Sequence, residues 1–215
     1  MVQIETARTE TPRQKPTPGN LGFGRHFSDH MFRMEYRDGA WISPRIEPYG
    51  AFVALEPAAS AIHYAQSIFE GFKAFRQANG EVAIFRPDAH AARFTRSAKR
   101  LCIPPVPEEL LVAACRQLVS LDADWVPREE GASLYLRPVI FATESFLGVR
   151  PATRYQLVVM TSPVGAYYAE GFAPVRILVE RRQVRAAPGG LGDVKTAANY
   201  AASLQAAMAA KEAGY

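Results

Sequence analysis

Residues 185–215 read RAAPGGLGDVKTAANYAASLQAAMAAKEAGY, and this stretch predicts a glycine-rich loop that opens into a helix. A short apolar run at 175–179 is typical of a strand that leads to the loop. Glycines within 188–192 let the backbone approach a ligand closely, and the alanine-rich run at 198–213 predicts a helix that ends at Gly214. The expected order is strand, loop and helix, with one lysine where the loop meets the helix.

That lysine, Lys195, lies where the positive end of the helix dipole disfavours a cation. It does not belong to a phosphate-binding P-loop, because Val194 stands where that motif needs a glycine. It also replaces the third glycine of a dinucleotide-binding motif. A lysine on a glycine turn beside Asn199 and Tyr200 is compatible with an amine that binds a carbonyl cofactor covalently. On spacing alone, a solvent-exposed lysine at a helix entrance is the commoner arrangement.

Size and composition restrict the class of protein. The chain has 215 residues, of which 48% are hydrophobic, enough for a sizeable core. Its net charge is +4 and its 25 basic residues are mixed with 21 acidic ones, which favours a small anionic ligand over a nucleic acid. No run approaches the ~18 apolar residues of a membrane span, and the first residues lack the apolar core of a signal peptide. We therefore expect a cytoplasmic protein.

The cysteines and histidines do not predict a metal site. Cys102 and Cys115 have no companion residues at zinc-ligand spacing, and two cysteines do not make a disulfide framework. The 4 histidines also lack the spacing of metal ligands. We expect two reduced thiols and no metal.

Alternating apolar residues and turn signals predict an α+β fold with antiparallel strands. Asp38-Gly39 and Asn79-Gly80 are typical of hairpin turns. The expected strands are 31–36, 40–46, 71–76, 82–86, 134–141 and 155–161. Helices are expected from Pro87 to Arg100 and from Pro107 onward, the second with an apolar stripe made by Leu110, Leu111, Ala114, Leu118 and Leu121.

The same signals divide the chain into four parts. Residues 1–22 are polar and rich in proline and threonine, which predicts a flexible N-terminal tail. Residues 23–163 form a small α+β domain, residues 164–173 a connector, and residues 174–215 the start of a larger domain.

Two further arginines are candidates for binding an anion. Tyr135 and Arg137 lie on one face of a predicted strand, where they could meet a carboxylate. An arginine paired with a surface acid beside a half-buried tyrosine is an equally common arrangement. Arg93 lies on a basic helix face, and such faces are usually only solvated.

Several segments together resemble one known family. They are HYAQSIFEGFKAF from His63, FRPDAHAARFTRSAKRL from Phe85, DWVP from Asp124, SLYLRP from Ser133, LGVRP from Leu147, SPVGAYY from Ser162 and GDVKTAANYAASL from Gly192. In order and spacing they are similar to the branched-chain amino acid aminotransferases, which are fold-type IV enzymes that use pyridoxal 5'-phosphate. The resemblance covers the chain from about Phe23 to its last residue.

The resemblance implies a role for individual residues. Lys195 would hold pyridoxal phosphate and move a proton between the cofactor and the substrate's α carbon. Arg93 matches the arginine that holds the cofactor phosphate, and Tyr200 the tyrosine bonded to its ring oxygen. The substrate pocket would be lined by Phe27, Tyr64, Phe69, Tyr135, Arg137, Val149 and Tyr167.

Within that pocket the aromatic wall would accept leucine, isoleucine and valine. The polar groups of Tyr64, Tyr135 and Arg137 would meet the second carboxylate of glutamate, so that glutamate and 2-oxoglutarate are the co-substrates. Tyr64 and Val149 would serve the neighbouring subunit of a homodimer. The implied role is branched-chain amino acid biosynthesis.

Members of the family continue for over a hundred residues beyond the position of Tyr215, and there carry an acid for the pyridine nitrogen. The acid that follows Lys195 here is Glu212, too far along a helix to reach the ring. We therefore expect the 215 residues alone to show negligible transaminase activity. The alternatives are a D-amino acid transaminase or an aminodeoxychorismate lyase of the same fold, or a truncated relative without catalysis.

Overall fold

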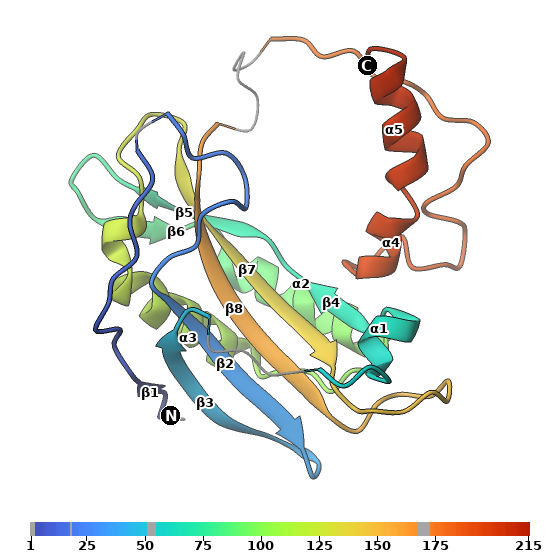
Figure 1. The fold of residues 1–215 in the computed structure, drawn as a ribbon, viewed down its shortest axis with the longest axis horizontal. Helices are drawn as coiled ribbons and strands as arrows, with labels where there is room; N and C mark the ends of the chain where they lie inside the picture. The colour runs from blue at the N-terminus through green and yellow to red at the C-terminus, as the bar shows by residue number, and fades with distance from the viewer. Residues whose placement is uncertain (1–2, 18, 51–54, 167–172) are drawn as a thin grey trace.

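The computed structural model describes residues 3–17, 19–50, 55–166 and 173–215. Within these residues the strands form an eight-stranded sheet of order β1-β3-β2-β8-β7-β5-β6, with β4 also paired to β7. The strands are β1 (Glu5–Thr6), β2 (His30–Arg37), β3 (Ala40–Pro48), β4 (Ser67–Phe69), β5 (Phe72–Arg76), β6 (Val82–Ile84), β7 (Ser133–Ala142) and β8 (Tyr155–Val164). The helices are α1 (Ser60–Tyr64), α2 (Pro87–Arg100), α3 (Glu108–Leu121), α4 (Ala197–Ala201) and α5 (Leu204–Glu212), with a 3-10 turn at Ala123–Trp125. Helices α2 and α3 lie against one face of the sheet (Figure 1), which confirms the expected α+β class.

Both predicted hairpins are present. Arg37 pairs with Ala40 across a two-residue turn, in which Asp38 and Gly39 have φ of 54° and 80°. Positive φ at both positions matches the twist of the flanking strands, and aspartate followed by glycine tolerates it. Strands β5 and β6 pair antiparallel around the second turn, where Gly80 has φ of 86°.

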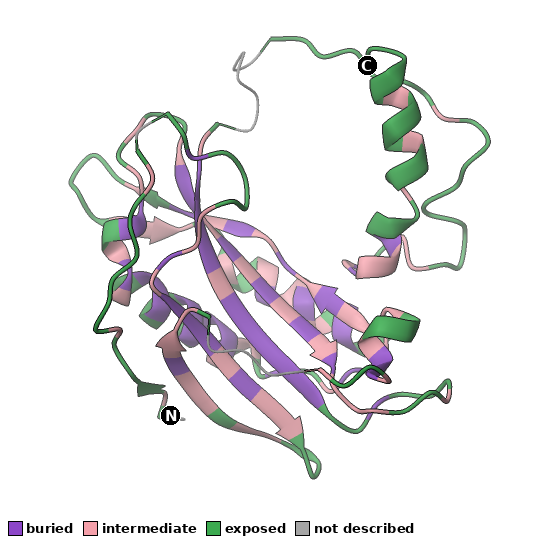
Figure 2. Cartoon of the chain, viewed as in Figure 1, coloured by how far each residue is buried: buried purple, intermediate pink, exposed green. Residues whose placement is uncertain are grey.

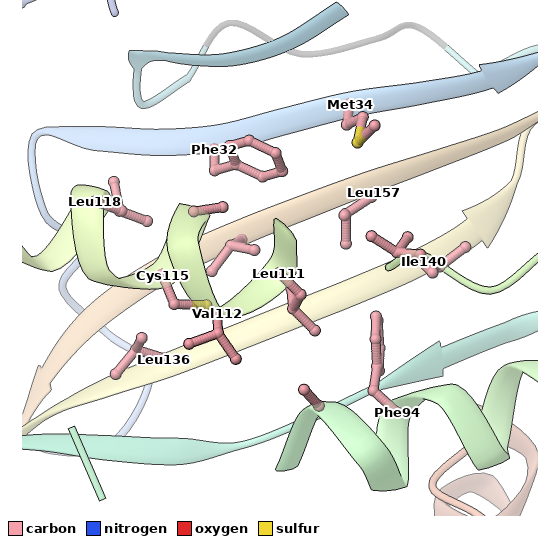
Figure 3. Packing of buried hydrophobic residues seen from close by; sticks show 14 of the residues in the cluster. Phe32, Met34, Phe94, Leu111, Val112, Cys115, Leu118, Leu136, Ile140 and Leu157 are labelled. Carbon is pink, nitrogen blue, oxygen red and sulfur yellow. The ribbon is translucent and has the colours of Figure 1, made fainter. Parts of the chain in front are cut away.

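Helix α3 and the sheet share one hydrophobic core. The apolar stripe predicted on α3 is confirmed, because Leu111, Ala114 and Leu118 are buried and its other two leucines pack beside them. Figure 2 shows burial concentrated on the sheet and on the helix faces turned toward it. Figure 3 shows side chains of α2 and α3 directed at strand residues such as Leu136 and Ile140.

Strands β4 and β5 lie end to end along the same side of β7. Phe69 pairs with Val139 and Phe72 pairs with Leu136, so the register continues unchanged across the gap between the two strands. Glu70 and Gly71 fill that gap, and the Glu70 N–H donates to the Pro138 carbonyl at 2.8 Å. The two short strands are thus one strand whose ladder is interrupted for two residues.

The N-terminal segment, expected to be a flexible tail over residues 1–22, contacts the sheet. Glu5 and Thr6 pair in parallel with β3, and Ile4 packs against the core. The Thr9 N–H donates to His30 Nε2 at 2.9 Å. These contacts anchor the segment because the sheet offers β3 as an edge strand, a partner that local composition does not reveal.

The C-terminal segment also differs from the expectation. Residues 175–179 form no strand, since no other strand of the described chain pairs with them, and Val175, Ile177 and Val179 are exposed. The predicted helix at 198–213 is interrupted at residues 202–203, and α5 has no buried residue. Strand β8 runs to Val164, one residue into the expected connector.

None of the described helices is long and apolar enough to cross a membrane.

Both cysteines are free thiols; Cys102 is exposed and Cys115 lies in the core.

Candidate functional site

The candidate site is organised by three consecutive residues: Phe69, which ends β4, and Glu70 and Gly71, which separate β4 from β5. Side chains alternate between the two faces of a strand, and the burial pattern follows that rule. Glu70 is buried on the helix-covered face, while Phe69 and Gly71 are half-buried on the other face. Each of the three contacts a different group of candidate residues.

The backbone of Lys195 is bonded to two elements distant in sequence. Its N–H donates to Ser97 Oγ on α2 at 3.0 Å, and its carbonyl accepts from the Phe69 N–H at 3.0 Å. The next residue, Thr196, forms a bridge with Ile68 and donates from its hydroxyl to the Ser67 carbonyl at 2.7 Å. The lysine is therefore positioned along the edge of β4.

Two side chains hold the glycine loop that precedes Lys195. Asn199 is buried, and its amide donates to the carbonyls of Leu191 at 2.7 Å and Val194 at 2.8 Å. Arg100, at the end of α2, donates to the carbonyl of Gly189 at 3.2 Å. These bonds tie the loop to itself and to α2.

The Lys195 side chain lies on an aromatic surface. Its Nζ donates a hydrogen bond to Tyr200 Oη and lies 4.8 Å from the centre of the Phe69 ring. The Phe69 and Tyr200 rings are themselves 4.8 Å apart. A lysine amine is thus presented between two aromatic rings with a hydroxyl beside it.

Tyr135 and Arg137 on β7 belong to the same cluster, as their shared strand face predicts. Arg137 Nη2 donates to Tyr135 Oη at 3.0 Å, and its guanidinium lies 4.5 Å from the centre of the Phe69 ring. A Cβ atom at Gly71 would come within 1.8 Å of Tyr135 Oη, so the position of this tyrosine requires glycine there. Phe23, which the sequence analysis did not select, meets the Tyr135 ring edge-on at 5.1 Å.

Arg93 reaches the site from α2 and is held by Glu70. Arg93 Nε and Nη2 donate to the two Glu70 oxygens at 2.5 Å and 2.7 Å. These hydrogen bonds raise the pKa of Arg93 above its ordinary value, and partial burial opposes the change. His90 Nδ1 lies 3.1 Å from Glu70 Oε2.

Glu70 was not among the residues predicted from the sequence, although a signal for it exists. In its strand, the positions that face the core are Ile68, Phe72 and Ala74, and Glu70 is the acid that interrupts this apolar series. Ser97 and Asn199 carried no comparable signal, because polar residues on helices are commonplace.

The other predicted pocket residues lie elsewhere. Phe27 stacks on Tyr49 at 4.8 Å. Tyr64 on α1 donates from its hydroxyl to the Leu147 carbonyl, and Val149 in the same loop is 86% exposed. No hydrogen bond or ring contact of the described residues links these side chains to the Lys195 cluster. Tyr167 lies outside the described residues.

The charges of the cluster suit an anionic ligand. Arg93, Arg137 and Lys195 supply three cations around the 69–71 segment, and the buried carboxylate of Glu70 neutralises one of them. The arrangement offers a primary amine, a hydroxyl, a guanidinium group and flat aromatic surfaces to one ligand.

Comparisons with known proteins identify the family of the chain. The family model described as amino-transferase class IV matches residues 67–215, more than half of the chain. Branched-chain-amino-acid transaminase 1 of Bacillus subtilis (strain 168) is 50% identical over 214 residues, which cover 99% of this chain and 60% of that protein. The branched-chain-amino-acid aminotransferase of Mycobacterium tuberculosis (strain H37Rv) is 49% identical over 195 residues, covering 90% of this chain and 53% of that protein.

Solved structures show the same fold. The branched-chain amino acid aminotransferase of T.th., solved with pyridoxamine 5'-phosphate, superposes with a TM-score of 0.64 at 28% identity, covering 84% of this chain and 56% of that one. The same enzyme complexed with N-(5'-phosphopyridoxyl)-L-glutamate gives 0.60 at 26% identity, over 91% and 56% of the two chains. The chain spans at most about 60% of the length of the curated relatives it matches. Its fold is that of the fold-type IV aminotransferases, and by the family match the chain belongs to the class IV amino-transferases.

Proposed function

We propose that this protein transfers amino groups between branched-chain amino acids and 2-oxoglutarate, with pyridoxal 5'-phosphate as its cofactor and Lys195 as its catalytic residue. The observation that carries the proposal is the Lys195 amine, hydrogen-bonded to Tyr200 and lying on the Phe69 ring. The relatives named branched-chain aminotransferases support the reaction class.

The donor set fits this cofactor. Pyridoxal phosphate has an aldehyde, a phenolic oxygen attached to its ring and a phosphate group, which call for an amine, a hydrogen-bond donor and a guanidinium group. Lys195, Tyr200 and Arg93 supply one of each in the cluster. The T.th. enzyme, solved with pyridoxamine 5'-phosphate, supports the choice.

When bound, the cofactor supplies an electron sink that allows the α proton of an amino acid to leave. The chain's own residues do the rest. Lys195 Nζ would hold the cofactor through its aldehyde, and the same amine would accept and return the α proton of the substrate. Tyr200 Oη keeps that amine oriented through their hydrogen bond. The Phe69 ring, 4.8 Å from Nζ, excludes water from one side of the amine and stabilises its charge.

Substrate recognition is assigned to the opposite part of the cluster. Phe69 and Tyr135 offer aromatic surface to the aliphatic side chains of leucine, isoleucine and valine. Arg137 and the Tyr135 hydroxyl offer donors to the second carboxylate of glutamate. The T.th. enzyme's complex with a phosphopyridoxyl-glutamate adduct supports glutamate as the amino donor. The family resemblance alone adds Phe27 and Tyr167 to the proposed pocket.

The protein is proposed to work as a homodimer, in which Tyr64 and Val149 line the partner's pocket. Both belong to a surface where the Tyr64 hydroxyl supports the loop that carries Leu147 and Val149. Val149 is 86% exposed and Leu147 is 60% exposed, so the loop presents apolar side chains outward.

The test is to trap the cofactor on its lysine. The purified protein is loaded with pyridoxal phosphate, reduced with borohydride and digested, and the modified peptide is identified by mass spectrometry. We expect the label on Lys195 and its loss in Lys195→Ala. Leucine-dependent turnover, measured on a chain that spans the whole length of the relatives, should be lost in the same variant. Lys211→Ala is the matched control, because Lys211 is an exposed lysine on α5, and it should leave both unchanged.

Labelling of another lysine, or near-normal turnover by Lys195→Ala, would refute the assignment of Lys195. Substrate choice is tested separately with leucine, D-alanine and aminodeoxychorismate. If the protein turns over D-alanine or aminodeoxychorismate but not leucine, the proposed branched-chain transamination is wrong, and the protein catalyses another reaction known for this fold.

A further inference from the structure

Glu70 occupies a position where its strand otherwise places apolar residues. Its side chain has no exposed surface, and its core-facing neighbours along the strand are Ile68 and Phe72. A carboxylate buried in this way costs several kcal/mol unless it is paired and fully hydrogen-bonded. A buried carboxylate at this position therefore calls for an explanation other than packing.

Every oxygen of Glu70 is bonded. Oε1 accepts from Arg93 Nε at 2.5 Å, and Oε2 accepts from Arg93 Nη2 at 2.7 Å. The Gly71 N–H donates to Oε2 at 3.2 Å, and His90 Nδ1 lies 3.1 Å from the same oxygen. The carboxylate thus binds one edge of the guanidinium group in a bidentate geometry, which fixes both the direction and the plane of that group.

This bidentate pair determines which N–H groups of Arg93 remain for a ligand. Nε and one N–H of Nη2 are used by Glu70, while Nη1 donates no hydrogen bond within the described residues. The Arg93 side chain is 40% exposed, whereas Glu70 beneath it is wholly buried. One edge of the guanidinium group is anchored in the core, and the opposite edge remains available to a ligand.

We infer that Glu70 is a positioning residue, which anchors Arg93 so that the available edge of its guanidinium group meets the phosphate of the cofactor. The inference rests on the proposed function, since it needs the cofactor at Lys195 and Arg93. It assigns to Glu70 a role in cofactor affinity and no contact with the reacting atoms.

The location of Glu70 links this anchor to the catalytic lysine. The preceding residue, Phe69, binds the Lys195 carbonyl through its N–H at 3.0 Å. Two adjacent residues thus set the positions of Arg93 and Lys195, the groups proposed for the two ends of the cofactor. Because adjacent residues make both contacts, the backbone at 69–70 links the position of the Arg93 guanidinium group to that of the Lys195 backbone.

The test compares Glu70→Gln with the wild type in binding two ligands, pyridoxal 5'-phosphate and pyridoxal. Pyridoxal has no phosphate, so it cannot report on Arg93. Glutamine keeps the shape of the side chain but loses the charge that anchors the guanidinium group. We expect the dissociation constant for pyridoxal phosphate to rise about tenfold, the scale of one hydrogen bond to a charged group, and that for pyridoxal to stay unchanged.

A double-mutant cycle separates positioning from general stability. If Glu70 acts through Arg93, Glu70→Gln should weaken pyridoxal phosphate binding in the wild-type background and have no further effect in Arg93→Ala. An equal loss for both ligands, or the same loss in the presence and absence of Arg93, would overturn the inference.

Asp122→Asn is the matched control. Asp122 is also a buried carboxylate, bonded to His30 Nδ1 at 2.6 Å, and it lies away from the Lys195 cluster. Thermal unfolding should show that both Asp122→Asn and Glu70→Gln lower the melting temperature. Only Glu70→Gln should weaken pyridoxal phosphate binding; a comparable effect of Asp122→Asn would make the loss a consequence of reduced stability and contradict the positioning role.

Should Glu70→Gln fail to fold, Glu70→Asp takes its place, because it keeps the charge but is too short to reach both Arg93 nitrogens. The same phosphate-specific loss is expected. Failure of the proposed function gives a different result: the wild type itself would then carry no cofactor on Lys195. If Lys195 is labelled and the Glu70 variant binds pyridoxal phosphate as tightly as the wild type, the positioning role of Glu70 is refuted while the proposed function stands.

Discussion

Removal of the Ser97 hydroxyl tests how Lys195, the proposed catalytic residue, is held. Ser97 lies on α2 four residues after Arg93, has no exposed surface, and accepts the Lys195 N–H at 3.0 Å. Ser97→Ala leaves that N–H without its partner. The neighbouring bonds, from the Phe69 N–H to the Lys195 carbonyl and from Thr196 to Ser67, remain.

The magnitude follows from the lost bond. A donor left unsatisfied in a buried site costs ~1–3 kcal/mol, which increases local opening of the turn about 5- to 150-fold. The global free energy of unfolding should change by less, because alanine is a better helix former than serine by roughly 0.5 kcal/mol. The effect should therefore be concentrated at residues 191–199.

Hydrogen exchange read by mass spectrometry is the assay. Peptides covering 191–199 should exchange faster in Ser97→Ala, while peptides from β7 and β8 should not. Ser120→Ala provides the control, since Ser120 is an exposed serine on the other helix. Unchanged exchange at 191–199 in a folded variant would show that the Ser97 hydroxyl does not hold Lys195.

Three further predictions concern the pocket, the thiols and the loop at 144–153. Arg137→Ala and Tyr135→Phe should slow the half-reaction with glutamate more than that with leucine, because a carboxylate loses donors and an aliphatic side chain only packing area; equal losses in single-turnover kinetics would contradict this. Burial raises the pKa of Cys115 to about 12, so a thiol reagent at pH 8 should titrate the exposed Cys102 in the folded protein and both cysteines only in denaturant. Hydrogen bonds from Arg150 lower the pKa of Glu144 from 4.5 to about 2. The ionised carboxylate therefore contributes stability in full above pH ~4.5, and the contribution is lost as the pH falls toward 2. The difference in the free energy of unfolding between wild type and Glu144→Gln, measured by urea unfolding, should narrow over that interval. A constant difference would show that the Glu144–Arg150 contact does not lower the pKa of Glu144.

Local patterns in the sequence were sufficient to predict most of the small domain. The Asp38-Gly39 and Asn79-Gly80 turns, the apolar stripe of α3 and the shared face of Tyr135 and Arg137 are all confirmed. Each is set by residues close together in the chain, where backbone geometry and side-chain periodicity decide the outcome.

Predictions failed where a segment depends on a distant partner. Residues 175–179, predicted as a strand, form none because no described strand pairs with them, whereas Glu5 and Thr6 pair with β3 although composition did not indicate a strand there. Apolar alternation indicates that a segment is able to form a strand, but a strand exists only where another one completes its hydrogen bonds.

In the candidate site too, local features follow from the sequence, and contacts between distant residues follow only from the tertiary structure. The sequence by itself determined that a lysine ends a glycine loop, and the resemblance to a known family suggested what Lys195, Arg93 and Tyr200 do. Only the tertiary structure decided that Lys195 is bonded to Ser97, 98 positions earlier, and that Glu70 anchors Arg93. Those bonds join groups far apart in the chain. They form only when the sheet and α2 have packed together, because packing is what brings the donors and acceptors within hydrogen-bond distance.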